Sequence, residues 1–88
     1  MRTDRDLFAA VRALPHMAIT KQDGEFRITY RIASIARADR GEHDAEWHRD
    51  HAERAAYYAT DRDDAFGTAK SLSAQMVRLL DRLAEREA

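Results

Sequence analysis

The chain contains no cysteine, one proline and three glycines among its 88 residues. Without cysteine it cannot form a disulfide framework, a thiol nucleophile, a cysteine-ligated zinc site or an iron–sulfur cluster. It has no apolar run of about 18 residues, so we expect no membrane-spanning segment. No apolar stretch follows the charged N-terminus, which does not look like a signal peptide. We therefore expect a cytoplasmic protein.

Hydrophobic residues make up 44% of the chain and charged residues 35%. This composition is typical of one small globular domain. The 15 basic and 16 acidic side chains give a formal charge of −1. Binding to a nucleic-acid backbone requires a basic surface, so this charge balance argues against a nucleic-acid-binding protein.

Residues 17–32 have the pattern of a β-hairpin. Two alternating segments flank Asp23-Gly24, a dipeptide typical of a two-residue type I′ turn. If Gln22 opposes Glu25, both strands place their apolar side chains on one face. These side chains are Met17, Ile19, Phe26, Ile28 and Tyr30, with Ile32 continuing the set. A shift of one residue would destroy this agreement, which determines the register.

Two segments have the apolar periodicity of amphipathic helices. The first covers residues 4–14 and is stopped by Pro15. The second starts at residue 60 or 61 and repeats apolar residues at spacings of three and four. These residues are Ala65, Ala69, Leu72, Met76, Leu79 and Leu83. Gly67 costs this helix about 1 kcal/mol relative to alanine, which a close contact between helix and sheet would explain.

The region between the hairpin and the last helix is less regular. Residues 36–41 are predicted to form a loop, and the polar residues 42–52 fit either a short helix or an extended hairpin arm. Residues 53–60 combine alanines with two tyrosines, and we predict a third strand there because a two-stranded hairpin alone is marginal. Tyr57 and Tyr58 should then point to opposite faces, one of them into the core.

These elements predict an α+β fold in a single domain, residues 1–88. The expected order is helix, three-stranded antiparallel sheet, helix (αβββα), with both helices on one face of the sheet. Residues 37–52 would form a charged insert between the second and third strands. The other face of the sheet would be open to solvent or to a partner.

Residues 53–69 read ERAAYYATDRDDAFGTA and follow the Asp23-Gly24 hairpin. This arrangement resembles a pattern in small uncharacterised proteins of bacterial plasmids, prophages and phages. In that pattern an Asp-Gly hairpin precedes a strand with "AYYT-D" and an acidic-capped helix that begins "DA-GTA". The resemblance implies origin in a mobile genetic element and carries no specific activity.

The predicted element order is also similar to that of the double-stranded-RNA-binding domain. That family places lysines at the start of its last helix, where they contact phosphates. Here Asp61, Asp63 and Asp64 occupy that position and would repel phosphate. The similarity is therefore one of element order, and we do not expect binding to double-stranded RNA.

Histidines cluster in the charged insert. If residues 42–52 are helical, Asp44, His48 and His51 share one helix face, a spacing that would suit a transition metal. Two histidines three residues apart are a weak signal, and we interpret the insert as a solvated segment without metal or cofactor. The chain has no Gly-rich phosphate loop and no nucleophile elbow. We therefore expect no enzymatic activity and no catalytic residue.

Candidate partner-binding residues lie on the open sheet face and in the insert. They are Arg27, Thr29, Arg31, Trp47 and Tyr57. Tryptophan and arginine dominate protein-binding hot spots. We expect a protein-interaction module of a mobile genetic element, for example an anti-CRISPR-like inhibitor of a host defence protein. The alternative is a nucleic-acid-binding accessory protein that uses the same Arg/Tyr face.

The last helix also predicts self-assembly. A helix of about 25 residues runs about 37 Å, whereas a strand of seven residues runs about 23 Å. The excess length carries Leu80 and Leu83, which would be partly exposed in a monomer. We therefore expect a homodimer. The alternative is that the first helix covers this surface with Leu7, Phe8 and Val11.

Overall fold

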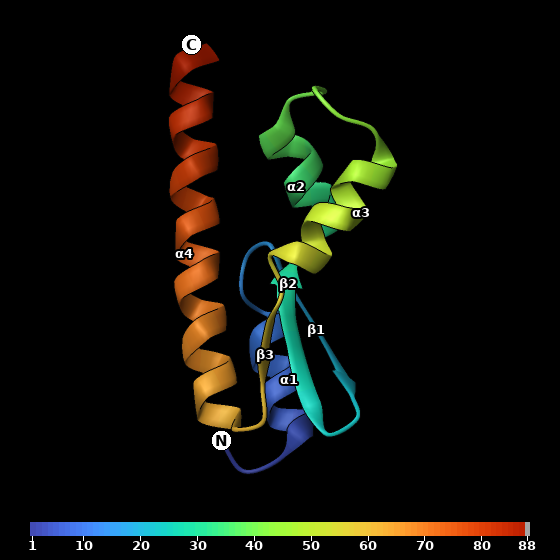
Figure 1. The fold of residues 1–88 in the computed structure, drawn as a ribbon. Coiled ribbons are helices and arrows are strands. Elements are labelled where there is room, and N and C mark those ends of the chain that lie inside the picture. Colours follow the sequence, from blue (N-terminus) through green and yellow to red (C-terminus); the bar gives the residue numbers. More distant parts are fainter. Residues whose placement is uncertain (88) are drawn as a thin grey trace.

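The computed structural model describes residues 1–87. This part of the chain contains four helices and a three-stranded antiparallel sheet (Figure 1). The elements are α1 (Asp4–Arg12), β1 (Met17–Gln22), β2 (Glu25–Tyr30), α2 (Ile32–Asp39), α3 (Ala45–Arg54), β3 (Tyr57–Ala59) and α4 (Arg62–Glu87). The predicted α+β class and antiparallel sheet are confirmed. Within residues 1–87, no helix combines the length and the apolar character that a membrane crossing requires.

The hairpin forms in the predicted register. Gln22 lies opposite Glu25, and the pairing continues to Met17 opposite Tyr30. Asp23 and Gly24 both have positive φ angles, 53° and 81°, as a type I′ turn requires. The strand order is β1-β2-β3, so β2 is the central strand.

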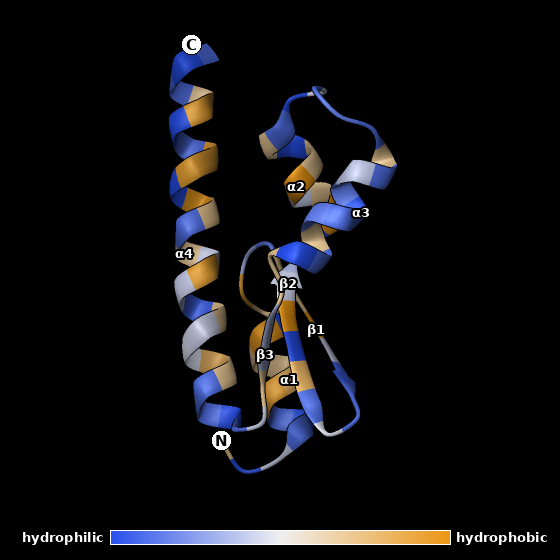
Figure 2. Cartoon of the chain, in the orientation of Figure 1, coloured by the Kyte–Doolittle hydropathy of each residue, from blue (hydrophilic) through white to orange (hydrophobic). Residues whose placement is uncertain are grey.

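The core joins the sheet to α1 and to the N-terminal half of α4. Its buried members are Leu7, Val11, Met17, Ile19, Phe26, Ile28, Ala59, Ala65 and Ala69. Figure 2 shows the corresponding apolar stretches on α1 and β2. Ala65 and Ala69 have no exposed surface, and their small side chains allow α4 to lie close to the sheet, where it contacts β2 and β3 most.

The segment after β2 differs from the prediction. Ile32 does not continue the buried strand face, because it begins α2 and is 42% exposed. Residues 36–39, predicted to be a loop, belong to the same helix. The carbonyl of Arg31 accepts hydrogen bonds from the N–H groups of Ser34 and Ile35 at 3.0 and 3.2 Å, which starts the helix. Alanine favours helix, but the β-branched isoleucines suggested a strand.

The polar residues 42–52 belong largely to α3, which excludes the extended arm. The Asp44 carboxylate caps this helix by accepting a hydrogen bond from the Trp47 N–H at 2.9 Å. Because α3 continues to Arg54, the strand predicted over 53–60 is reduced to the three residues of β3. Two helices therefore connect β2 to β3, and the predicted αβββα order omits both.

The C-terminal half of α4 lies beside α2, not α1 (Figure 1). Leu80 is only 9% exposed, so its predicted exposure in a monomer is wrong. Arg40, the residue after α2, forms a 3.1 Å ion pair with Glu87 at the end of α4. The unpredicted helix α2 thus supplies a neighbour for the length of α4 that the sheet cannot cover. The exposed patch from which we predicted a homodimer is correspondingly smaller.

Gly67 is an exposed residue of α4, and a Cβ atom added there would meet nothing within 4 Å. The close contact with the sheet that we predicted for it is therefore absent. We expect Gly67→Ala to raise the free energy of unfolding by about 1 kcal/mol, because alanine loses less backbone entropy in a helix. Urea unfolding followed by circular dichroism would measure the change. A loss of stability would contradict the open surroundings of this residue.

Asp4 joins three elements, because its carboxylate accepts from Lys21 on β1 at 2.6 Å and from Arg62 on α4 at 2.8 Å. These hydrogen bonds lower the pKa of Asp4 below its usual value of 3.8, and their charges add to the effect. The carboxylate therefore stabilises the fold above about pH 4, and this contribution disappears as pH falls through the lower folded-state pKa.

We accordingly expect Asp4→Asn to be less stable than the wild type at pH 7 and the difference to shrink below pH ~4. Urea unfolding of both proteins between pH 7 and pH ~3 would test this. Asp6→Asn is the matched control, since Asp6 is another first-turn carboxylate of α1 and forms no ion pair among residues 1–87. A difference between wild type and Asp4→Asn that is constant with pH would contradict the ion-pair interpretation.

Candidate functional site

The sheet face expected to bind a partner is partly covered by α3. Thr29 is only 4% exposed, and its hydroxyl donates to the Ala52 carbonyl at 2.8 Å. The Arg27 guanidinium forms an ion pair with Glu53. Both side chains therefore hold α3 against β2, and the open face that we predicted is smaller than expected.

Arg31 likewise makes internal contacts. Its Nε donates to the Met17 carbonyl at 2.9 Å and its Nη2 to the Arg12 carbonyl at 3.0 Å. The guanidinium thus joins the end of α1 and the start of β1 to the residue that precedes α2. These bonds give Arg31 a role in the fold, although part of the side chain remains exposed.

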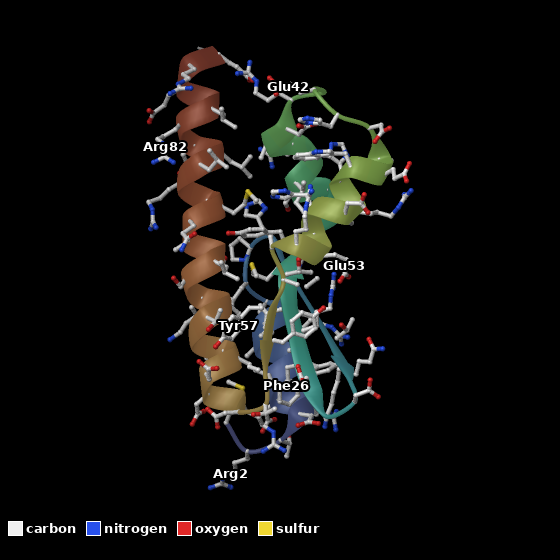
Figure 3. All side chains as sticks on the ribbon, in the orientation of Figure 1. Arg2, Phe26, Glu42, Glu53, Tyr57 and Arg82 are labelled. Carbon is white, nitrogen blue, oxygen red and sulfur yellow. The ribbon has the colours of Figure 1, made fainter. Side chains whose placement is uncertain are left out.

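Neither tyrosine of β3 is a core residue, contrary to our expectation, because Tyr57 is 39% and Tyr58 49% exposed. Tyr57 lies opposite Ile28 and Tyr58 lies opposite Arg27. Side chains of directly paired residues share a face, so Tyr58, not Tyr57, belongs to the Arg27 face. The Tyr57 hydroxyl instead donates to Asp64 at 2.9 Å, and this bond raises the pKa of Tyr57. Figure 3 shows Tyr57 beside α4.

Asp39, the last residue of α2, holds two histidines, and its side chain is 4% exposed. Its Oδ1 lies 2.5 Å from Nδ1 of His43, and its Oδ2 lies 2.9 Å from Nε2 of His48. The backbone N–H of His43 also donates to Oδ2, at 2.8 Å. Burial raises the pKa of Asp39, but the hydrogen bonds from the histidines outweigh burial and lower the pKa to about 2. Asp39 is therefore ionised at neutral pH.

Trp47 is half-buried between two imidazole rings. The His43 ring stacks on it at 3.9 Å with an interplanar angle of 8°, and the His51 ring stacks at 4.9 Å and 12°. Both distances are measured between ring centroids. This stack uses both faces of the indole, so Trp47 is not the free anchor for a partner that the sequence suggested. It fixes the orientation of both histidines instead.

The histidine cluster that the sequence analysis weighed and rejected as a metal site, Asp44, His48 and His51, does not come together. Asp44 caps α3, His48 faces Asp39, and His51 stacks on Trp47. A different group of possible metal ligands does come together. Ligand atoms of Asp39, Glu42 and His43 all lie within 4.8 Å of one another. The sequence contains one signal for this set, the spacing of four residues between Asp39 and His43, but Asp39 was assigned to a loop and His43 to the segment 42–52.

A cavity of about 410 Å³ lies between α4 and the α2–α3 pair. Its apolar lining consists of Tyr30, Ile35, Ala38, Met76 and Leu79, and its polar lining consists of His51, Gln75, Arg78 and Arg82. Arg82 extends from the side of α4 that faces away from α2 and α3 (Figure 3). Arg78 and Arg82 both line the cavity and are both exposed, so they border it at its lip. Burial raises the pKa of the Tyr30 hydroxyl.

Neither Arg78 nor Arg82 has a carboxylate within ion-pair distance among residues 1–87, unlike Arg27, Arg40 and Arg62. The sequence places Met76 and Leu79 on the apolar face of the last helix and does not single out the arginines. A helix packed against the C-terminal half of α4 was needed to define this cavity, and that helix was not predicted. The cavity's volume of about 410 Å³ exceeds the volume of about 250 Å³ of a second cavity, which lies near Asp4 and Arg62.

Comparisons with protein-family models, curated proteins and solved structures find no match to this chain.

Proposed function

We propose that the chain is a non-enzymatic protein-interaction module of a mobile genetic element and acts in the cytoplasm as an inhibitor of a host defence protein, as anti-CRISPR proteins do. The resemblance of residues 53–69 and of the Asp23-Gly24 hairpin to plasmid and phage proteins supports the mobile-element origin. The binding surface in this proposal is the cavity between α4 and the α2–α3 pair, in place of the sheet face.

The observation that carries the proposal is the combination of apolar lining and uncompensated arginines. Tyr30 and Leu79, which are half-buried, offer apolar surface inside the cavity, while Arg78 and Arg82 at its lip have no ion-pair partner among residues 1–87. Arginines around an apolar pocket are typical of protein-binding hot spots. A partner segment with an apolar side chain and flanking carboxylates would fit both features.

Charge reversal at the lip tests this surface. We expect tagged wild-type protein to retain a specific host protein and the double variant Arg78→Glu/Arg82→Glu to lose it, because the new carboxylates would repel an acidic partner. Arg2→Glu/Arg5→Glu is the matched control, since it makes the same change in net charge at two exposed positions near α1. Equal capture by both double variants would contradict the cavity as the binding surface.

Two further measurements separate the remaining alternatives. Retention on heparin or DNA that collapses with salt would favour the nucleic-acid-binding accessory protein, for which Tyr58, 49% exposed, is an exposed aromatic of the sheet face. Sedimentation over a range of protein concentrations tests the homodimer. A 10.1 kDa species at tens of micromolar would contradict self-association and leave a host protein as the partner.

A further inference from the structure

We propose that the turn between α2 and α3 binds a divalent cation of the zinc type through Asp39, Glu42 and His43. Ligand atoms of these three residues lie within 4.8 Å of one another. Carboxylate oxygen and imidazole nitrogen are ordinary zinc ligands. The set lies at the tip of the α2–α3 pair, where Figure 3 labels Glu42, and none of its residues lines the cavity.

The backbone brings the three ligands together. Asp39 ends α2, and Arg40 and Gly41 then adopt positive φ angles of 58° and 77°. These two residues reverse the direction of the chain, so that Glu42 and His43 lie alongside the C-terminal end of α2. The backbone N–H of His43 donates a hydrogen bond to Oδ2 of Asp39 at 2.8 Å, and this bond stabilises the chain reversal.

The metal would replace a proton. Asp39 Oδ1 and His43 Nδ1 are 2.5 Å apart and share a hydrogen bond. Two ligand atoms of a tetrahedral zinc ion, each about 2.1 Å from the metal, lie about 3.4 Å apart. Binding therefore requires these atoms to separate by about 1 Å and the bridging proton to leave. The His43 side chain is 40% exposed, which leaves room for this movement and a path for the ion.

Neighbouring side chains orient the ligands. His48 lies 2.9 Å from the second oxygen of Asp39, the kind of outer hydrogen bond that fixes metal-ligating carboxylates. The Trp47 indole stacks on the His43 ring at 3.9 Å and fixes its plane. The buried Asp39 carboxylate, with its side chain 4% exposed, supplies the anionic charge. Three protein ligands leave a fourth position for water or a partner's side chain.

Calorimetric titration with Zn²⁺ would test the site directly. We expect one ion per chain and at least ten-fold weaker binding by His43→Gln and by Glu42→Gln. Both residues are exposed, so their variants should fold, which circular dichroism can verify. Glu46→Gln in α3 and His16→Gln in the turn between α1 and β1 are matched controls, because they make the same chemical changes away from the ligand set. Their affinities should stay within about two-fold of the wild type.

Tryptophan fluorescence locates the ion. The chain has a single tryptophan, Trp47, in contact with the His43 ring. Paramagnetic Co²⁺ at His43 should therefore quench the fluorescence with the stoichiometry that Zn²⁺ shows in calorimetry, and Zn²⁺ should reverse the quenching. The proposal is wrong if the wild type binds no Zn²⁺ at 100 µM (about 5.5 kcal/mol), or if His43→Gln binds it as tightly as the wild type. Either result leaves the interaction proposal for the cavity intact.

Discussion

Replacing Ile28 with alanine is expected to lower the free energy of unfolding by about 2–5 kcal/mol. Ile28 has no exposed surface. It lies on the central strand, opposite Ile19 on β1 and Tyr57 on β3. The truncation would remove apolar contacts and leave a cavity that the surrounding strands cannot easily close. Small domains have a total stability of about 5–15 kcal/mol, so this loss would leave the variant close to unfolding.

Ile32→Ala is the matched control, because it deletes the same atoms at a position that is 42% exposed. Its free energy of unfolding should stay within about 0.5 kcal/mol of the wild type. Urea unfolding of both variants, followed by circular dichroism, would measure the difference. If the two variants were equally destabilised, the burial difference between Ile28 and Ile32 would be wrong.

Leu80→Ala is expected to cost about 2–3 kcal/mol even in a monomer. Leu80 is only 9% exposed, in the half of α4 that contacts α2. Removing its side chain should therefore weaken the attachment of α2 to α4 within one chain. The cost should not depend on protein concentration, because no second copy takes part in this burial.

Leu83→Ala is the comparison variant, since Leu83 lies one helical turn further along α4 and is half-buried. We expect it to cost less than Leu80→Ala. Thermal unfolding of both at several protein concentrations would measure the two effects. A midpoint that rises with concentration in the wild type and not in Leu80→Ala would instead place Leu80 in a dimer interface.

The elements whose signals are local were predictable. The Asp23-Gly24 turn and the alternation on both sides of it determine the hairpin register. The connection from β2 to β3 was not predictable in the same way. Ile32 and Ile35 have high strand propensity, and only the packing of α2 against α3 and α4 makes a helix the better arrangement.

The positions of the candidate site residues depend on the connection between β2 and β3, which α2 and α3 form. Arg27 and Thr29 do share one face of β2 by strand alternation, but their partners lie on α3. Arg31 follows the strand, and its guanidinium bonds to the end of α1 and the start of β1. Asp39 was missed because it was assigned to a loop. The cavity was missed because Ile35 of α2 and Leu79 of α4 come together only after two unpredicted helices fold.

The two halves of α4 have different neighbours, and this has a consequence for local unfolding. Ala65 and Ala69 belong to the core with the sheet and α1, whereas Met76 and Leu79 share a cavity with α2. Regions with fewer buried contacts open more often than the core. The backbone amides of α2, α3 and the end of α4 should therefore exchange with solvent as one group, faster than those of β2. Such opening would widen the cavity while the sheet stays folded.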